Sequence, residues 1–460
     1  MRYGKVLIGA GVVVGAAATL YGYAYYKYPP RRAEPVATST APAPVPAAPQ
    51  ASPTTEPAAP ADRATFDRCV RGGFPTPENA EQRNAECSKA IMTRQLSPDD
   101  LALARLIRGS ARMTLGDKVM AREDYIEALK RYDALVDSRN PEALALFRRA
   151  AAEDALGNTE KALYDYGRAI RLDPTASLAF LGRGVLLATR KRAYERAIED
   201  FNKVLVLEPD NVQALIRRGD AFSQLGDTGR ALVDLDRAIG LAPQSTQAYF
   251  YRGLVHSRRN ETVAALADYN AALERGPHNV DALTSRAAIY SLDGKLGLAI
   301  QDLDAAIAID KENSYAFFNR GFAYFAQAEY QKAIDDYTRA IALDPDFGLA
   351  YNNRALARAV LGKDLPQALA DCDMALKLLP GNLEVRDTRG FIYLKLGDPA
   401  LALNEYNLAL ERDPNRTTAL FGSGLAKIRM GDIKAGEGDQ AAARTLDPEI
   451  DKQFTFYGLD

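Results

Sequence analysis

FFNRGFAYFAQAEYQKAIDDYTRAIALDP, residues 317–345, is a mostly apolar stretch interrupted at Ala328 and Glu329. The interruption divides it into two segments, each of a length suited to a short amphipathic helix. The stretch therefore predicts a helical hairpin. Arg320 and Asp336 occupy positions in it where packing residues are expected.

The same hairpin recurs along the chain from about residue 101 onward. Small residues in both predicted helices allow close approach, and a Tyr or Phe near the middle of the second helix fills the space between hairpins. Prolines close the successive units in steps of 34 or 35 residues with one unit skipped: Pro174, Pro209, Pro243, Pro277, Pro345, Pro380, Pro414 and Pro448. A fixed period of this length is typical of a helical solenoid.

The period and the G-x-x-Y…A-x-x-x-F…P pattern resemble those of the tetratricopeptide repeat family. The resemblance covers residues 102–450, as ten units. It implies an all-α, right-handed superhelix, an α-solenoid, whose first helices line the concave face. We expect residues 64–101 to form an N-terminal capping half-repeat and the tail, 451–460, to cover the other end.

The N-terminal segment, residues 1–28, has a basic start followed by an uncharged apolar run at 6–26. This run is long enough to span a bilayer, which predicts a transmembrane anchor; a cleaved signal peptide is the alternative. Gly11 and Gly15 form a GxxxG pair that favours a homodimer. Residues 29–63 are rich in Pro and Ala and predict a disordered linker. The expected localisation is single-pass in a bacterial inner membrane, with the repeats in the periplasm.

Composition argues against several classes of function. The chain has 58 basic and 60 acidic residues, so no bulk attraction to nucleic acid is expected. It has only two His and three Cys, too few for most His/Cys metal sites. No nucleotide-binding or hydrolase motif is present, and no region is left over for a catalytic domain. We therefore expect neither enzymatic activity nor a cofactor.

One acidic residue matches one arginine in each of nine units, sixteen or seventeen positions later. One interpretation is a ladder of charges for an ionic ligand. The other is a partly buried ion pair within each hairpin or to its neighbour, which strict matching favours because half a buried pair costs several kcal/mol. The central pairs of this ladder are Arg218 with Asp234, Arg252 with Asp268, Arg286 with Asp302, and Arg320 with Asp336.

Cys69 and Cys87 flank the expected turn of the N-terminal half-repeat. In a helical hairpin they can face each other and form a disulfide, which requires an oxidising compartment. The alternative is a pair of small buried thiols.

Proteins of the family that the repeats resemble generally bind peptides or protein segments on the concave face. Aromatic and amide side chains of the first helices make a candidate partner groove there, with packing between helices as the alternative reading of the rings. Its residues are Phe250, Tyr251, Tyr315, Phe318, Asn319, Phe322, Phe325, Asn352 and Asn353. We expect a non-enzymatic scaffold or adaptor that binds a protein or peptide segment. The alternatives are a scaffold subunit of an envelope enzyme or assembly complex, and a self-assembling array.

Overall fold

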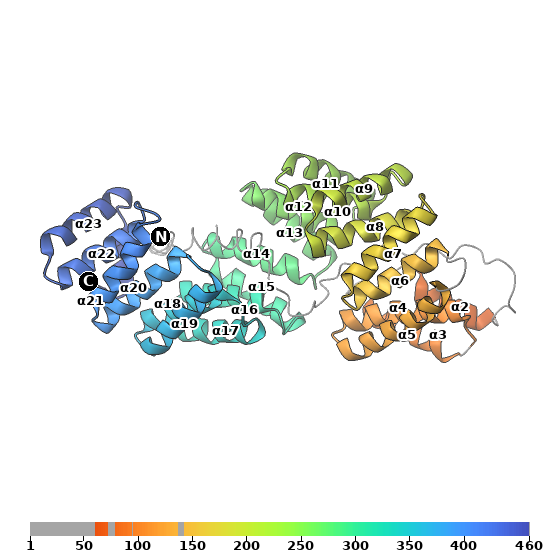
Figure 1. Cartoon of the computed structure of the whole chain (residues 1–460), viewed down its shortest axis with the longest axis horizontal. Coiled ribbons are helices and arrows are strands. Elements are labelled where there is room, and N and C mark those ends of the chain that lie inside the picture. The colour runs from red at the N-terminus through yellow and green to blue at the C-terminus, as the bar shows by residue number, and fades with distance from the viewer. Residues whose placement is uncertain (1–59, 72–78, 94, 137–141, 460) are drawn as a thin grey trace. The chain divides into compact units, whose positions relative to one another are not determined.

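The structure, a computed structural model, describes residues 60–459 except 72–78, 94 and 137–141. All regular secondary structure in this part of the chain is helical, which confirms the all-α prediction. The described residues form two compact units, 60–278 and 279–459, and each is considered by itself (Figure 1).

The unit 60–278 consists of consecutive helical hairpins. It begins with α2 (Pro60–Val70) and α3 (Ala80–Met92). The hairpins that follow are α4 (Pro98–Thr114) with α5 (Lys118–Val136), α6 (Ala143–Ala155) with α7 (Thr159–Leu172), α8 (Ser177–Leu186) with α9 (Tyr194–Leu207), α10 (Val212–Gln224) with α11 (Thr228–Leu241), and α12 (Thr246–Arg258) with α13 (Thr262–Arg275).

The unit 279–459 continues the same pattern and ends with a short extra helix, α24 (Ile450–Phe456). Its hairpins are α14 (Val280–Leu292) with α15 (Leu296–Ile309), α16 (Ser314–Ala326) with α17 (Tyr330–Leu343), α18 (Gly348–Leu361) with α19 (Leu365–Leu378), α20 (Leu383–Leu396) with α21 (Pro399–Leu410), and α22 (Thr417–Arg429) with α23 (Ile433–Leu446). Within each unit, most neighbouring first helices contact each other, and we call the layer that the first helices form the inner layer.

The opening stretch forms the hairpin α16–α17 at the expected place. Asn313 caps α16 by accepting a hydrogen bond from the backbone N–H of Ala316, which satisfies one of the free donors at a helix start. The turn residue Ala328 has a φ of 60°, in the left-handed region where other hairpins have glycine. Gly321 lets the two helices meet, because a Cβ there would lie 2.9 Å from Cε1 of Tyr337.

Two hairpins carry one extra residue, and the structure absorbs it differently in each. After α8, the chain forms a π-helical turn, η1 (Leu187–Lys191), and Arg192 then takes a left-handed conformation. Between α18 and α19, Gly362 and Asp364 both have positive φ. In both hairpins the arginine and its acidic partner remain paired, so the insertions are confined to the turns.

The predicted localisation is corrected here. Across the residues that the structure describes, no helix combines the length and apolar character needed to cross a membrane. A single-pass membrane protein requires such a helix, so that prediction is wrong and is not retained. The expected span at 6–26, with Gly11 and Gly15, lies outside the described residues, and neither a membrane segment nor a homodimer is supported.

Candidate functional site

The arginine ladder forms paired contacts inside the hairpins. In eight hairpins the Nε and Nη2 atoms of the arginine donate to the two carboxylate oxygens of its aspartate, at 2.6–2.9 Å. This forked geometry matches the planar guanidinium to the carboxylate. The eight pairs are Arg108–Asp124, Arg149–Asp165, Arg183–Asp200, Arg218–Asp234, Arg252–Asp268, Arg286–Asp302, Arg320–Asp336 and Arg354–Asp371.

At least six ladder arginines also donate through Nη1 to the second helix of the preceding hairpin, a contact that the sequence analysis missed. The acceptors lie at 2.6–3.2 Å: Asp133, Asn202, Asp236, Asp304, Thr338 and Asp373. Five of them stand two residues after the ladder acid of their own hairpin, so a polar residue at that spacing was the available signal. Each such arginine thus ties together three helices.

The ninth pair, Arg389 with Glu405, departs from this geometry. A single bond of 2.8 Å joins Arg389 Nη2 to Glu405 Oε1, and the buried Nε of Arg389 has no partner. Arg386 donates to the other carboxylate oxygen at 3.1 Å. Glutamate has one methylene more than aspartate, and the fork is lost in this hairpin alone among the nine.

The acidic residues of the ladder are buried more deeply than its arginines. The ladder acids expose only 2–9% of their side chains, compared with 13–28% for the arginines. Hydrogen bonds to Asp336 and Asp304 raise the pKa of Arg320, so its guanidinium stays charged. With its donors used on the protein, the ladder has little left for a ligand, and we interpret it as a structural element that sets helix register.

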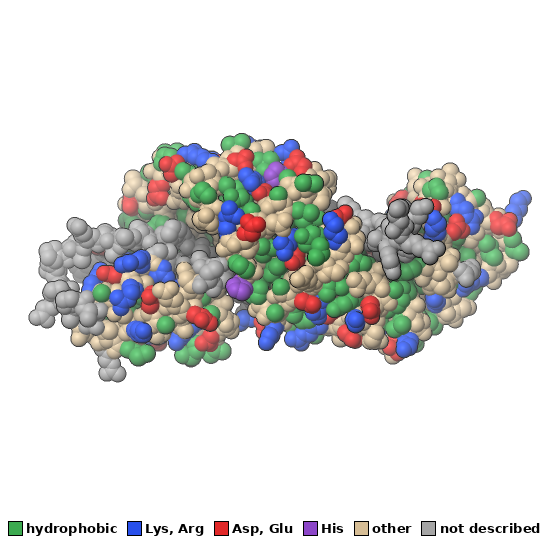
Figure 2. Space-filling view, turned by 180° about the vertical axis from the view of Figure 1, so that it is seen from behind, with side chains coloured by type: hydrophobic (Ala, Val, Ile, Leu, Met, Phe, Trp, Pro, Cys, Tyr) green, Lys and Arg blue, Asp and Glu red, His purple; other side chains and the backbone are tan. Residues whose placement is uncertain are grey.

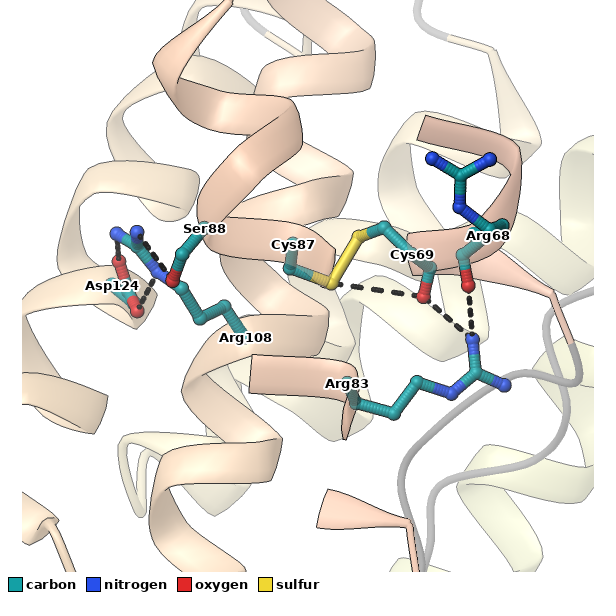
Figure 3. Close-up of a disulfide and its surroundings, with 7 residues drawn as sticks. All are labelled: Arg68, Cys69, Arg83, Cys87, Ser88, Arg108 and Asp124. Atoms are coloured by element: carbon teal, nitrogen blue, oxygen red, sulfur yellow. Dashed lines mark hydrogen bonds and ion pairs between the residues drawn. A yellow bond between two sulfur atoms is a disulfide. The ribbon is translucent and has the colours of Figure 1, made fainter. Parts of the chain in front are cut away.

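A disulfide joins the two helices of the N-terminal hairpin (Figure 3). Cys69 at the end of α2 and Cys87 in α3 are joined by a disulfide, with their Cα atoms 4.7 Å apart. Arg83 donates to the carbonyl oxygens of Arg68 and Cys69 at 2.8 and 2.7 Å, which satisfies the end of α2. Cys372, in contrast, is buried and unpaired in α19.

The residues of the candidate partner groove divide into two sets. Phe250 and Phe318 are buried and pack on Tyr269 and Tyr337 of their own hairpins. Packing also accounts for Tyr315, which lies against Phe347, while the Tyr251 hydroxyl accepts a hydrogen bond from Arg217 and Asn319 is buried. The other four, Phe322, Phe325, Asn352 and Asn353, line one cavity.

This cavity, of about 300 Å³, lies on the inner layer of the unit 279–459. We call it the inner cavity. The helices α16, α18, α20 and α22 form its walls, and the terminal helix α24 contributes Gln453, Phe454 and Tyr457. The tail was expected only as a cap, so these three residues were missed. So were the remaining lining residues: Tyr337, Leu356, Glu384, Asp387, Thr388, Phe391, Tyr406, Asp413, Asn415, Arg416, Thr417 and Thr418.

The inner cavity coincides with a change at one repeat position, two residues before the ladder arginine. In most hairpins this position is a buried apolar residue: Leu106, Phe147, Leu181, Ile216, Phe250 and Phe318. In α18 and α20 it is Asn352 and Asp387. The aromatic residue that would pack on it is also lost in α19, where Cys372 stands in the position of Tyr337. Large side chains are therefore replaced by small polar ones in neighbouring hairpins.

Several polar atoms around the inner cavity are buried and have no hydrogen-bond partner in the part of the chain that the structure describes. They are Asn352 Oδ1, Asp387 Oδ1, Tyr406 OH and Gln453 Oε1. The side chains of Asn352 and Gln453 are 5% exposed, and Tyr406 is 1% exposed. Buried acceptors are normally satisfied, so a group of unsatisfied ones calls for an explanation.

Acidic groups dominate the charge of the inner cavity: Glu384, Asp387 and Asp413 face one cation, Arg416. Arg416 Nε donates to Asp387 Oδ2 at 2.7 Å, and Thr418 donates to the same oxygen. Burial raises the pKa of Glu384 to about 7, against the opposing effect of Arg416. Burial likewise raises the pKa of Asp387.

No other chemistry stands out in the part of the chain that the structure describes. No group of three or more His, Cys, Asp or Glu residues in it is placed to hold a metal ion. Figure 2 shows basic and acidic side chains interspersed on the visible face, without a patch of one sign.

Comparison with known proteins agrees with the repeat. Sequence models described as "Tetratricopeptide repeat" match residues 143–176, 181–246, 216–279, 252–314, 314–347 and 383–416. Together these ranges cover just over half of the chain.

Curated relatives match shorter stretches. DnaJ homolog subfamily C member 3 of Rattus norvegicus is 37% identical over 97 residues, 21% of this chain and 19% of its own length. Hsp70-Hsp90 organizing protein of Triticum aestivum is 30% identical over 105 residues, which are 22% of this chain and 18% of its own length. Small glutamine-rich tetratricopeptide repeat-containing protein 2 of Mycosarcoma maydis is 30% identical over 129 residues, which are 28% of this chain and 34% of its own length. The chain thus spans about a fifth to a third of these relatives.

Among solved structures, a monomeric mutant of IFIT1 with Gppp-AAAA has a TM-score of 0.51 at 14% identity, covering 84% of this chain and 95% of its own. YrrB, described as a TPR protein with an unusual peptide-binding site, has a TM-score of 0.32 at 25% identity, covering 40% and 95%. Proteins built on this repeat serve as protein-interaction scaffolds. From its matched repeats and its helical hairpins, this chain belongs to the tetratricopeptide repeat family.

Proposed function

We propose that this protein is a non-enzymatic scaffold that holds a segment of a partner protein on the inner layer of the unit 279–459. The observation that carries the proposal is the inner cavity, where buried polar atoms of four different helices have no hydrogen-bond partner among the described residues. Polar groups that must otherwise remain unsatisfied are what a binding site requires.

The ladder supports this assignment by exclusion. It engages one arginine on each of nine first helices in contacts within the protein, which leaves these arginines few donors for a ligand. The inner cavity is the place where the repeat pattern is broken at neighbouring positions, Asn352 and Asp387. A volume of about 300 Å³ suits one or two side chains of an extended segment rather than a whole helix.

The experiment is a selection of peptides from a display library on the full chain, followed by affinity measurement with two matched variants. Asn352→Phe places at the inner cavity the residue that Phe318 provides in the preceding hairpin. Thr284→Phe makes a similar polar-to-aromatic change at the same repeat position in α14, which does not line the cavity.

The expected result is that selected segments bind wild type and Thr284→Phe alike and bind Asn352→Phe at least about tenfold more weakly. If no segment is selected, or if both variants bind as wild type does, the inner layer of this unit is not the binding surface. A scaffold subunit of an enzyme complex would bind in the same way; a self-assembling array would instead show a mass that rises with concentration.

A further inference from the structure

Three buried hydrogen-bond acceptors at the lining of the inner cavity have no partner in the described part of the chain. Asn352 contributes an amide oxygen from α18, Asp387 a carboxylate oxygen from α20, and Gln453 an amide oxygen from α24, all without partners. Tyr406, from α21, adds a hydroxyl group. A ligand that satisfies these atoms must carry several N–H or O–H donors.

The position of the Tyr406 hydroxyl depends on two glycines. A Cβ at Gly390 in α20 would lie 2.7 Å from Cζ of Tyr406, and one at Gly422 in α22 would lie 2.3 Å from it. Gly422 stands at the repeat position that carries Asn319, Asn353 and Thr388 in the preceding hairpins. The ring therefore passes between two first helices, with its unpartnered hydroxyl at the lining of the inner cavity.

The charge of the inner cavity is suited to a cation. Glu384 and Asp413 have no ion pair within 4.0 Å in the described part of the chain, whereas the one lining cation, Arg416, is paired with Asp387. Seven aromatic residues share the lining: Phe322, Phe325, Tyr337, Phe391, Tyr406, Phe454 and Tyr457. Acidic groups together with aromatic faces attract a flat, weakly hydrated cation.

Accepting our proposed function, we propose that the inner cavity binds the guanidinium group of an arginine side chain in the partner segment. A guanidinium presents five N–H donors in one plane, which matches acceptors contributed by several helices, and it stacks on aromatic rings. An ammonium group has three donors around a point and leaves more of these acceptors unsatisfied. A carboxylate has no donors at all when ionised and is repelled.

The side chains that α20 contributes to the lining also disfavour a carboxylate ligand. Glu384 and Asp387 are acidic and Thr388 is uncharged, so α20 provides no cation there.

The test uses short peptides that differ in one central residue. Because the chain contains no tryptophan, Phe325→Trp in the full chain gives a single indole reporter at the lining of the inner cavity. The central residue is arginine, its neutral isostere citrulline, lysine or glutamate. We expect arginine to bind about tenfold or more tightly than citrulline, since a charged hydrogen bond is lost. Lysine should fall between these two, and glutamate should not bind.

Two variants connect the preference to the residues. Asp387→Asn and Glu384→Gln should each weaken arginine binding about tenfold and leave citrulline binding unchanged. Glu384 is only half-buried, so its variant remains informative if Asp387→Asn folds poorly. Equal binding of arginine and citrulline, or an unchanged arginine preference in Glu384→Gln, overturns the proposal.

A last arm identifies the source of the arginine. If deleting residues 1–59, which include Arg31 and Arg32, raises the affinity for the arginine peptide, this chain supplies its own occupant and the partner assignment is wrong. The outcomes also separate the two proposals. Selected segments that bind without preferring arginine leave the scaffold function intact and refute the guanidinium; no binding of any segment or peptide refutes both.

Discussion

The inner layers at α10–α12 and at α18–α20 are built from the same repeat, yet they treat their polar groups differently. At α10–α12, Arg217 donates to the hydroxyl of Tyr251 at 2.9 Å, from the same repeat position in successive hairpins. At α18–α20 these positions hold Asn353 and Thr388, and the residues before them are Asn352 and Asp387, with unpartnered oxygens. Helices of the same repeat therefore carry hydrogen-bonded side chains at these positions in one region and unpartnered oxygens in the other, and side chains at two adjacent positions make the difference.

The largest effect should be common to both regions, because the ladder runs through both units. Asp234→Ala in α11 and Asp336→Ala in α17 each leave a partly buried arginine without its partner, and each should lower the free energy of unfolding by about 3–5 kcal/mol. Chemical denaturation of the variants measures this. Removing the exposed Asp293, which pairs with Lys295, should cost only about 0–1 kcal/mol. If Asp234→Ala and Asp336→Ala lose as little unfolding free energy as this control, the ion pairs of the ladder do not stabilise the hairpins.

The region at α18–α20 should respond to pH through Glu384. Its pKa in the folded protein is about 7, compared with an ordinary value of 4.5. A raised folded pKa gives a stabilising contribution that is full below pH 4.5 and is lost as the pH rises through about 7. The charge of Asp387 also raises the pKa of Glu384, whereas the charge of Arg416 lowers it.

Glu384→Gln should therefore flatten the fall in stability between pH 4.5 and 7, measured as denaturation midpoints, whereas the exposed Glu411→Gln should leave it unchanged. An identical pH profile for wild type and Glu384→Gln would contradict the burial of this carboxyl group.

Two tyrosine hydroxyl groups allow a direct comparison of the two regions, because one is hydrogen-bonded and the other has no partner among the described residues. Tyr251→Phe removes a hydroxyl that is bonded to Arg217 and should cost about 1 kcal/mol. Tyr406→Phe removes a buried hydroxyl that has no partner, so it should be neutral or stabilising. Equal losses of stability in the two variants would mean that Tyr406 has a partner inside the folded chain.

The smallest change concerns the one irregular ladder pair. Glu405→Asp gives this hairpin the acid found in the other eight, and lets both carboxylate oxygens meet the fork of Arg389. We expect a gain of about 0.5–1 kcal/mol in unfolding free energy. The reverse change, Asp234→Glu, should lose a similar amount. A loss in Glu405→Asp would show that Arg386 is the more important partner of Glu405.

The fold was predictable because the same sequence pattern recurs in each helical hairpin. The turn at Ala328, the small residues and the proline at most boundaries are local signals, and ten copies reduce the ambiguity that a single hairpin has. The spacing of arginine and acid predicted a pair within each hairpin or to its neighbour, and it left these two alternatives open.

The inner cavity was predictable only in part. Phe322, Phe325, Asn352 and Asn353 were identified as side chains of the inner layer, but Phe250 and Phe318 were grouped with them although they pack within hairpins. Sequence alignment of the units does contain the signal, the change from aromatic to Asn352 and Asp387. The contribution of Gln453 depends on where α24 folds back, which no repeat dictates.

We propose that the inner cavity serves a ligand at the expense of packing within the unit 279–459. The most direct measurement is the melting temperature of wild type and Asn352→Phe, each with and without a selected peptide. We predict that Asn352→Phe melts higher than wild type without peptide, and that the peptide raises the melting temperature of wild type only. If Asn352→Phe gains as much from the peptide as wild type does, the segment binds elsewhere and the account is wrong.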